Sequence, residues 1–302
     1  MKPVLEVLTS GTAYLAKRDV DEARLNMEHL LAHVLACRRM DLYLRFDQPV
    51  PESALEILRP LLKRRGEGEP LQHLLGTVEF CGHELIVDQR ALIPRPETET
   101  LVELLLQRTG SQPPLRVLDI CTGSGCIGLS LAKAWPQSIV TLSDISEDAL
   151  ELARLNADRL ELSSRVKFIR SDLFNKIPGT FDLIVSNPPY IATAEITTLS
   201  REVRRDPMLA LDGGPTGTEF PIRLAEAAVP HLHESSTLAF ELGMDQSDVV
   251  AAKLMALGFG KIEVKSDLAG IERFIFASAC PQAIIAPGLA EMDDTLSQNA
   301  DV

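Results

Sequence analysis

From Pro113 to residue 278 the chain alternates between short apolar runs and amphipathic segments. Runs such as RVLDI, SIVTLSDI and FDLIVS are typical of buried strands, and the segments between them have the 3.6-residue period of helices. Parallel strands need helical crossovers of this kind. The last two runs, KIEVKSD and RFIFAS, have no helix between them and predict an antiparallel edge hairpin. We therefore predict an α/β fold with a mostly parallel, doubly wound sheet.

The N-terminal part of the chain has a different pattern. Three segments with a 3.6-residue apolar period predict a small all-helical domain over residues 1–73. The period then changes around Gly82, and residues 74–96 are predicted to form a β-hairpin linker. The α/β domain is expected over residues 97–279. Residues 280–302 lose all periodicity, and we predict a disordered tail there.

The net charge of −13 limits the partners that this chain can bind. Residues 1–75 contain eleven basic and eleven acidic side chains, so the whole excess of negative charge lies in the α/β part. An acidic surface is a poor binder of nucleic acid, because neutralisation of phosphates supplies most non-specific affinity. We therefore expect no direct binding to nucleic acid. The neutral, locally basic helical domain is suited to recognition of a protein substrate instead.

Other classes of protein are disfavoured by what the sequence lacks. No apolar run approaches the roughly 20 residues that span a bilayer, and the N-terminus has no secretion signal. The five cysteines form no CxxC pair, which is typical of a reducing compartment. His29 and His33 have a metal-binding spacing but no carboxylate or third ligand nearby. These observations predict a cytoplasmic protein without a metal site, and we expect a monomer.

A glycine-rich turn follows the first apolar run of the α/β part. The run VLDI contains Asp119 and leads into Thr122, Gly123 and Gly125, after which a helix begins. In a doubly wound fold this turn lies where ligands bind, and glycines let the backbone approach them closely. Asp144 ends the next strand, where a carboxylate can accept both hydroxyls of a ribose. The turn and the acid together predict a cofactor that contains a nucleoside.

The turn alone leaves two cofactor classes open, nicotinamide dinucleotides and S-adenosylmethionine. A dinucleotide brings a pyrophosphate, which the motif G-x-G-x-x-G binds at the start of a helix. Gly123, Gly125 and Gly128 have that spacing. The choice between the two cofactors therefore depends on a second motif.

That motif is Asn187-Pro188-Pro189-Tyr190, which follows the run FDLIVS. It is expected at the same edge of the sheet as the glycine turn. Two prolines fix the main chain and remove two N–H donors, which leaves carbonyl groups to face a ligand. The amide oxygen of Asn187 is an acceptor, and Tyr190 offers a flat face and a hydroxyl. These groups suit a planar substrate with an NH2 group, held with its nitrogen toward a sulfonium methyl group.

The Asn-Pro-Pro-Tyr motif resembles that of methyltransferases that use S-adenosylmethionine to modify amino groups. Further segments, in chain order, are similar to the N(5)-glutamine methyltransferases of peptide chain release factors: GEPLQHLLGTVEFCGHEL, LIPRPETETLVE, LDICTGSG, SDISEDAL, SDLF, SNPPYI, DPMLALDGGPTG, FELGMDQ and DLAGIERF. The resemblance extends from residue 3 to residue 277. It implies a Rossmann-like, seven-stranded class I methyltransferase domain behind a helical domain. The implied substrate is the glutamine of the Gly-Gly-Gln loop in class I release factors.

The resemblance also implies a role for individual residues of the cofactor site. The turn with Thr122 would bind the cofactor, with Asp119, Gly123 and Gly125 at its methionine end. Asp144 would bind the ribose, and Asp172 of SDLF would lie near the adenine. This chain departs from the pattern at Cys121, where many relatives have glycine. We expect altered packing or cofactor affinity there.

For the substrate, the resemblance implies that Asn187, Pro188 and Tyr190 grip the glutamine amide, with Pro189 beside them and Asn187 also near the cofactor. Arg95 and Glu97 of the segment PRPETE would lie at the domain junction beside the active site.

Three alternatives remain open from the sequence. The sister family of glutamine methyltransferases acts on a ribosomal protein, and the segment PRPETE favours a release factor over it. An enzyme that methylates the amino group of adenine or guanine would use the same chemistry but needs a basic groove. A methyltransferase-like domain could also serve only to dock partners, without catalysis.

Overall fold

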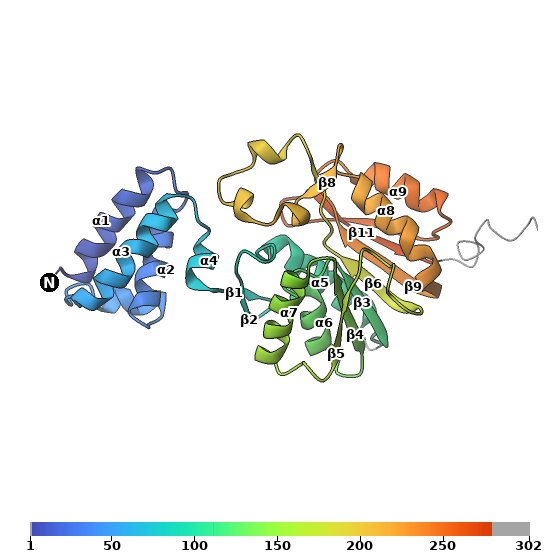
Figure 1. Cartoon of the computed structure of the whole chain (residues 1–302), viewed down its shortest axis with the longest axis horizontal. Helices are drawn as coiled ribbons and strands as arrows, with labels where there is room; N and C mark the ends of the chain where they lie inside the picture. Colours follow the sequence, from blue (N-terminus) through green and yellow to red (C-terminus); the bar gives the residue numbers. More distant parts are fainter. Residues whose placement is uncertain (1, 111, 280–302) are drawn as a thin grey trace, which may run out of the picture.

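The computed structural model of the chain describes residues 2–110 and 112–279. A helical N-terminal domain lies at one end of the molecule, and a larger α/β domain follows it through a short hairpin (Figure 1). The disordered tail predicted for residues 280–302 lies outside the described residues. In the part of the chain that the structure describes, no helix is both long and apolar enough to cross a membrane.

The N-terminal domain is all helical. It consists of α1 (Val4–Ala16), α2 (Ala23–Val34), η1 (Arg39–Leu44), α3 (Glu52–Gly66) and α4 (Leu71–Leu75). The apolar positions of these helices meet in a separate core, whose fully buried members include Leu15, Met27, Leu30, Leu31 and Leu42. Each such side chain contributes about 1.5–3 kcal/mol of transfer free energy, so the domain has a hydrophobic core of its own.

An antiparallel hairpin connects the two domains. Strands β1 (Thr77–Phe80) and β2 (His83–Ile86) pair with Thr77 opposite Ile86. The turn between them contains Gly82 at φ +74°, a left-handed conformation that favours glycine. Phe80 and Leu85 point into the core of the α/β domain, so the hairpin packs as part of that domain.

The α/β domain contains a seven-stranded sheet in the order β10-β11-β9-β6-β3-β4-β5. The strands are β3 (Arg116–Ile120), β4 (Ile139–Asp144), β5 (Val166–Arg170), β6 (Phe181–Ser186), β9 (Leu232–Glu241), β10 (Ile262–Ser266) and β11 (Glu272–Ser278). The first five are parallel, whereas β11 pairs antiparallel with both β9 and β10. The predicted doubly wound α/β fold, its seven strands and its closing antiparallel hairpin are confirmed.

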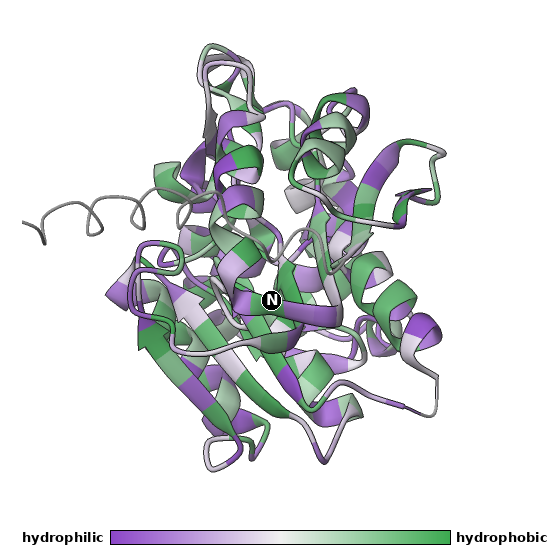
Figure 2. Cartoon of the chain, turned by 90° about the vertical axis from the view of Figure 1, so that its right-hand side faces the viewer, coloured by the Kyte–Doolittle hydropathy of each residue, from purple (hydrophilic) through white to green (hydrophobic). Residues whose placement is uncertain are grey.

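Helices cover both faces of this sheet. The helices on one face are α5 (Pro96–Thr109), α6 (Cys126–Ala134) and α7 (Glu147–Arg159). The helices on the other face are α8 (Glu219–Ala228) and α9 (Ser247–Ala256), and the short turn η5 (Val229–His231) follows α8. Successive β3 residues face opposite cores, with Val117 toward α5 and α6 and Leu118 toward α8 and α9. Hydrophobic and hydrophilic residues alternate along the helices, as expected for helices with one buried and one exposed face (Figure 2).

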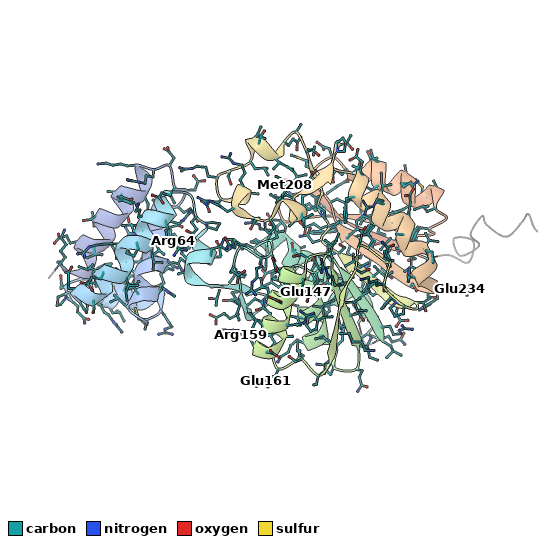
Figure 3. The ribbon with its side chains drawn as sticks, in the orientation of Figure 1. Arg64, Glu147, Arg159, Glu161, Met208 and Glu234 are labelled. Atoms are coloured by element: carbon teal, nitrogen blue, oxygen red, sulfur yellow. The ribbon has the colours of Figure 1, made fainter. Side chains whose placement is uncertain are left out.

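A long connection between β6 and α8 was not predicted from the sequence. It begins and ends in two short strands, β7 (Ile191–Ala192) and β8 (Asp212–Gly214), which pair with each other. We call residues 193–211 between them the strap; it contains the turns η2 (Ile196–Thr198), η3 (Val203–Arg205) and η4 (Met208–Ala210). Met208, labelled in Figure 3, lies on the strap. Arg65 of the helical domain contacts Glu202 of the strap, so the strap joins both domains.

Candidate active site

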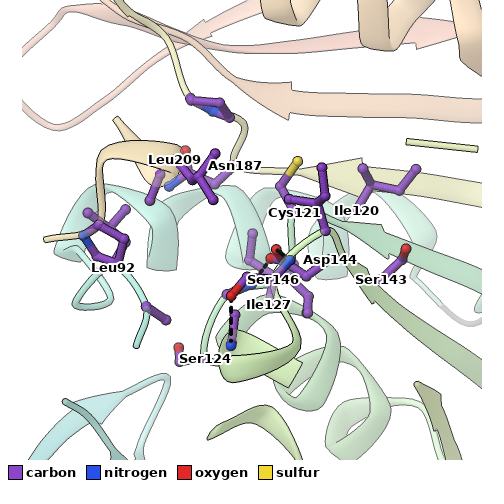
Figure 4. Close-up of a pocket in the computed structure, with 18 of the residues that line it drawn as sticks. Leu92, Ile120, Cys121, Ser124, Ile127, Ser143, Asp144, Ser146, Asn187 and Leu209 are labelled. Atoms are coloured by element: carbon purple, nitrogen blue, oxygen red, sulfur yellow. Dashed lines mark hydrogen bonds between the residues drawn. The ribbon is translucent and has the colours of Figure 1, made fainter. Parts of the chain in front are cut away.

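A cavity of about 440 Å³ opens at the carboxyl ends of β3, β4 and β6. This volume lies within the range typical of small-molecule sites. The segments that line the cavity include the glycine turn after β3, the end of β4, the start of the Asn-Pro-Pro-Tyr motif and part of the strap. Figure 4 shows Asn187 and Leu209 on one side of this cavity and Asp144 and Ser146 on the other. Both predicted motifs therefore contribute to a single cavity.

The glycine turn has a backbone that only glycine adopts easily. Gly123 and Gly125 have φ values of +55° and +85°. A Cβ at Gly125 would lie 2.9 Å from Leu129 Cδ1, so the turn also packs too tightly there for a side chain. A Cβ at Gly123 would meet only Ala91, at 3.7 Å, and Gly123 lines the cavity whereas Gly125 lies behind it. The turn is thus a tight cradle, with the half-buried backbone of Gly123 at the cavity wall.

Asp119 supports this turn from behind and does not line the cavity. Its carboxylate is fully buried, and Oδ2 accepts hydrogen bonds from Thr122 Oγ1 at 2.6 Å and from Gly128 N at 2.8 Å. Its Oδ1 is buried without a partner. Burial raises the pKa of Asp119 to about 7. The resemblance implies that Asp119 lines the methionine end of the cofactor, whereas the structure places its carboxylate behind the cavity wall, in contact with Thr122.

The third glycine of the G-x-G-x-x-G spacing has a structural explanation here. The N–H of Gly128 donates to Asp119, so this donor is already used within the protein. A Cβ at Gly128 would lie 2.9 Å from Asp119 Oδ2 and 3.1 Å from Leu142 Cγ. Close packing of α6 against the sheet therefore accounts for this glycine, without a pyrophosphate.

Two acidic side chains line the nucleoside side of the cavity. Asp144 ends β4, and its carboxylate accepts from Gly123 N at 3.0 Å and Ser146 N at 2.9 Å. Burial raises the pKa of Asp144. Asp172 is more exposed, and Arg223 donates to its Oδ1 at 3.2 Å. Each carboxylate keeps acceptor capacity toward the cavity, since a carboxylate has about four lone-pair sites.

Cys121 lines the cavity beside the glycine turn. It has φ +58°, in the left-handed region that side chains other than glycine rarely adopt. Burial raises the pKa of the Cys121 thiol well above its usual range, which disfavours the thiolate form. The departure from glycine at this position therefore introduces backbone strain directly at the site.

Asn187 is held by a chain of buried side chains. Its Nδ2 donates to Thr98 Oγ1 at 3.0 Å, and Thr98 Oγ1 donates to Glu241 Oε2 at 2.7 Å. Thr98 and Glu241 are each 1 % exposed. Burial raises the pKa of Glu241, while the hydrogen bonds from Thr98 and Tyr190 oppose this shift. With Nδ2 bound to Thr98, the remaining polar atom of the Asn187 side chain is its acceptor, Oδ1.

The rest of the motif has a supporting position. Pro189 lines the cavity, whereas Pro188 and Tyr190 do not. The hydroxyl of Tyr190 donates to Glu241 Oε1 at 3.0 Å, and burial raises the pKa of this hydroxyl. The hydroxyl of Tyr190 is thus bound to Glu241, and the residue is not part of the cavity wall. Gln246 Nε2 donates to the Tyr190 carbonyl at 2.7 Å, which fixes the end of the motif.

Arg95 and Glu97 lie at the start of α5, near the domain junction. Arg95 lines the cavity, and its Nη2 donates to Asp206 Oδ2 of the strap at 2.5 Å. Asp206 is buried, and burial raises its pKa despite the Arg95 charge. Glu97 is exposed and does not line the cavity. Of this pair, only Arg95 contributes directly to the cavity wall.

Sequence reasoning missed three buried residues that support the site. Thr98 and Glu241 lie in the segments PRPETE and FELGMDQ, and the sequence predicted no role for either residue. Asn156 is fully buried, and its Nδ2 donates to Ser124 O at 2.9 Å and Ile86 O at 3.0 Å. A polar residue on the apolar face of a predicted helix is a signal that could have identified Asn156.

Within residues 2–110 and 112–279, no three His, Cys, Asp or Glu side chains cluster as metal ligands would.

The residues present fit S-adenosylmethionine. The open backbone at Gly123, the carboxylate of Asp144 and apolar side chains such as Ile127 and Leu173 line one cavity. These groups suit, in this order, the amino-acid end, the ribose and the flat base of the cofactor. Asn187 lies in the wall of the same cavity, so a planar amide bound there is close to the cofactor end.

Comparisons with known proteins agree with this arrangement. The model of the PrmC N-terminal domain family matches residues 6–76, and the methyltransferase small domain model matches residues 96–205. The release factor glutamine methyltransferase of Chlorobaculum tepidum is 40% identical over 281 residues, which cover 89% of this chain and 95% of that protein. The protein of the same name in Agrobacterium fabrum is 42% identical over 252 residues, covering 82% and 87% of the two chains.

Solved structures of lower identity share the fold. A methyltransferase from Pyrococcus furiosus has a TM-score of 0.50 and 22% identity, and the match covers 66% of this chain and 89% of that one. The human Mettl16 catalytic domain, solved in complex with the MAT2A 3'UTR hairpin 6, has a TM-score of 0.55 and 15% identity, and covers 72% and 81%. These likenesses confirm the class I methyltransferase fold.

Proposed function

Because this chain belongs to the release factor glutamine methyltransferase family, we propose that it methylates the side-chain amide nitrogen of the Gly-Gly-Gln glutamine in class I release factors. S-adenosylmethionine is its cofactor. The observation that carries the proposal is the orientation of Asn187. It lines the cofactor cavity, and its Nδ2 is bound to Thr98.

The glycine turn and the two acids are the residues that would hold the cofactor. We assign the Gly123 backbone and Thr122 to its amino-acid end, Asp144 to the ribose and Asp172 to the adenine side. When bound, the cofactor supplies a methyl group on a sulfonium centre. Asp119 is assigned a supporting role, because it reaches the turn only from behind.

On the substrate side, Asn187 Oδ1 would accept a hydrogen bond from the glutamine NH2 group. An amide nitrogen is a weak nucleophile, since its lone pair is delocalised into the carbonyl. Acceptors that hold its hydrogens orient the nitrogen and stabilise the positive charge that develops on it. The proton can leave after methyl transfer, so no strong general base is needed. Pro189 lines the wall beside Asn187, and Pro188 and Tyr190 support the motif.

A labelling experiment tests this function. The enzyme is incubated with methyl-labelled cofactor and a class I release factor, and in parallel with the release factor whose loop glutamine is replaced by alanine. We expect label in the natural release factor alone, on the glutamine side chain by mass spectrometry. Equal labelling of both proteins would contradict the proposed substrate.

The remaining parts of the assignment stay predictions. We propose domains at residues 1–73, 74–96 and 97–279, with the helical domain contributing to substrate recognition. Its separate core supports this division. A monomeric state, a cytoplasmic location and the lack of direct nucleic-acid binding are supported by the sequence arguments. Size-exclusion chromatography with light scattering, and binding to RNA at low salt, would test the first and the last.

A further inference from the structure

Four side chains form a continuous hydrogen-bonded relay behind the cavity. It runs from Asn187 through Thr98 to Glu241, and from the other oxygen of Glu241 to Tyr190. The residues come from α5, β9 and the motif after β6, and Thr98 and Glu241 are 143 positions apart. Asn187 and Thr98 line the cavity, whereas Glu241 and Tyr190 do not. Glu241 and Tyr190 therefore act on a substrate only through Thr98 and Asn187 or through the shape of the motif.

The chemistry of Glu241 gives this relay a direction. Both oxygens of Glu241 accept in the structure, Oε2 from the hydroxyl of Thr98 and Oε1 from the hydroxyl of Tyr190, so the carboxylate is the acceptor end of the relay. With its proton directed to Glu241, Thr98 Oγ1 can only accept from Asn187. The group of Asn187 that faces Thr98 is therefore the donor Nδ2, and its acceptor Oδ1 is left for the cavity.

We propose that Thr98 and Glu241 are positioning residues that fix the orientation of the Asn187 amide, so that an acceptor and not a donor meets the substrate NH2 group. This inference rests on the proposed function. An asparagine amide can turn by 180° with little change in shape, and the turned form would place its own NH2 against that of the glutamine. The acceptor-only end of the relay excludes the turned form.

The burial of Glu241 supports this role. A carboxylate that is 1 % exposed and receives hydrogen bonds from two neutral hydroxyls is costly for the fold. Burial of a carboxylate at such a cost to stability is expected mainly at functional sites. Tyr190, on the second oxygen, is further fixed by Gln246, so the same carboxylate also anchors the end of the motif.

Variants of Thr98 test the relay with little change in shape. Thr98→Val removes the hydroxyl, and Thr98→Ser keeps it. Thr100→Val is the matched control, because it replaces a threonine by valine on the same helix but outside the relay. We expect kcat for the release factor to fall about 10- to 100-fold in Thr98→Val. In Thr98→Ser and Thr100→Val it should stay within about threefold of the parent enzyme. The Kd for S-adenosylhomocysteine should be unchanged in all three.

A second readout does not depend on catalysis. The side-chain amide protons of Asn187, followed by NMR without cofactor, should exchange slowly in the parent and in Thr98→Ser, and faster in Thr98→Val. Equal kcat in Thr98→Val and Thr100→Val, or equal amide exchange in the parent and Thr98→Val, would overturn the proposal.

Glu241→Gln provides an independent variant if Thr98→Val does not fold. Glutamine offers one acceptor and one donor group, so the direction of the relay is no longer fixed. We expect kcat to fall by about tenfold with unchanged cofactor binding. Parental kcat in a folded Glu241→Gln variant would contradict the inference. If the parent enzyme transfers no methyl group at all, the proposed function fails instead, while the amide exchange of Asn187 still tests the relay.

Discussion

Two residues next to the glycine turn, at the end of β3 and directly after it, occupy states that most residues avoid. Cys121 has a left-handed backbone, and Asp119 is a fully buried acid with one oxygen unpartnered. Both are costly for the free energy of folding, by strain in the first case and by desolvation in the second. Both residues adjoin the turn that we propose holds the cofactor, which is where such costs are expected.

Backbone strain at Cys121 should be released by glycine. We expect Cys121→Gly to have a free energy of unfolding about 1 kcal/mol higher than Cys121→Ala, because alanine keeps the left-handed strain. Both variants lack the thiol, so the comparison isolates the backbone. Urea unfolding measures the difference. An alanine variant as stable as the glycine variant would show that the conformation at residue 121 is not strained.

The raised pKa of Asp119 predicts a pH dependence of stability. The carboxyl has a pKa of about 7 in the folded protein and about 4 when unfolded. The folded state thus binds the proton more tightly, so the contribution of Asp119 to the free energy of unfolding falls as the pH rises from about 4 to about 7, and is then constant.

Asp119→Asn removes this titration. The melting temperature of the variant relative to the parent should therefore rise between pH 5 and pH 7 and level off above it. A difference that stays constant over this range would contradict the shifted pKa of Asp119.

At the scale of elements, one side chain connects the β1–β2 hairpin to the glycine turn. Asn156 on α7 donates to Ser124 O and Ile86 O, and its Oδ1 accepts from Ile86 N at 2.6 Å. The three elements meet at a fully buried amide. The hairpin therefore helps to hold the turn, although no residue of β1 or β2 lines the cavity.

We expect Asn156→Ala to lower the free energy of unfolding by about 3 kcal/mol, because it leaves one buried main-chain group, Ser124 O, and two part-buried groups of Ile86 without partners. The loosened turn should also bind S-adenosylhomocysteine more weakly. Thermal unfolding and calorimetric titration measure the two effects. A destabilised variant with parental affinity would mean that the hairpin supports the fold but not the turn.

The elements themselves were largely predictable from the sequence. Apolar runs and helical periods are local signals, and they identified the sheet strands, the glycine turn and the motif at Asn187. The strap was missed, since it consists of short turns without a period. Thr98, Glu241 and Tyr190 could not be connected from the sequence, because their hydrogen bonds join segments 143 and 51 residues apart. Burial of Asp119 behind the turn likewise depends on how α6 packs.

At the scale of the whole molecule, the strap is attached to both domains. Arg65 of the helical domain, only 3 % exposed, donates to Glu202 at 2.5 Å, and Arg201 donates to the carbonyl of Arg18 at 2.6 Å. Arg95 of the α/β domain binds Asp206 of the same segment. The strap also carries Met208 and Leu209, which are exposed and line the cavity. We expect a protein substrate that enters the cavity to contact these two residues.

Loss of the Glu202 carboxylate should therefore impair substrate binding more than cofactor binding. In Glu202→Gln the buried charge of Arg65 loses its partner, and the strap is held less firmly against the helical domain. We expect a higher KM for the release factor and an unchanged Kd for S-adenosylhomocysteine, with Glu195→Gln as the control on the strap. An unchanged KM would show that the two domains do not hold the substrate together.

We infer that one cavity brings a methyl donor to a glutamine amide held by Asn187. Single-turnover methylation of a release factor by Asn187→Ala tests it most directly, with the Kd for S-adenosylhomocysteine measured on the same protein. We predict parental affinity for S-adenosylhomocysteine and a rate of methyl transfer lower by about 100-fold or more. Methyl transfer at the parental rate would contradict the account.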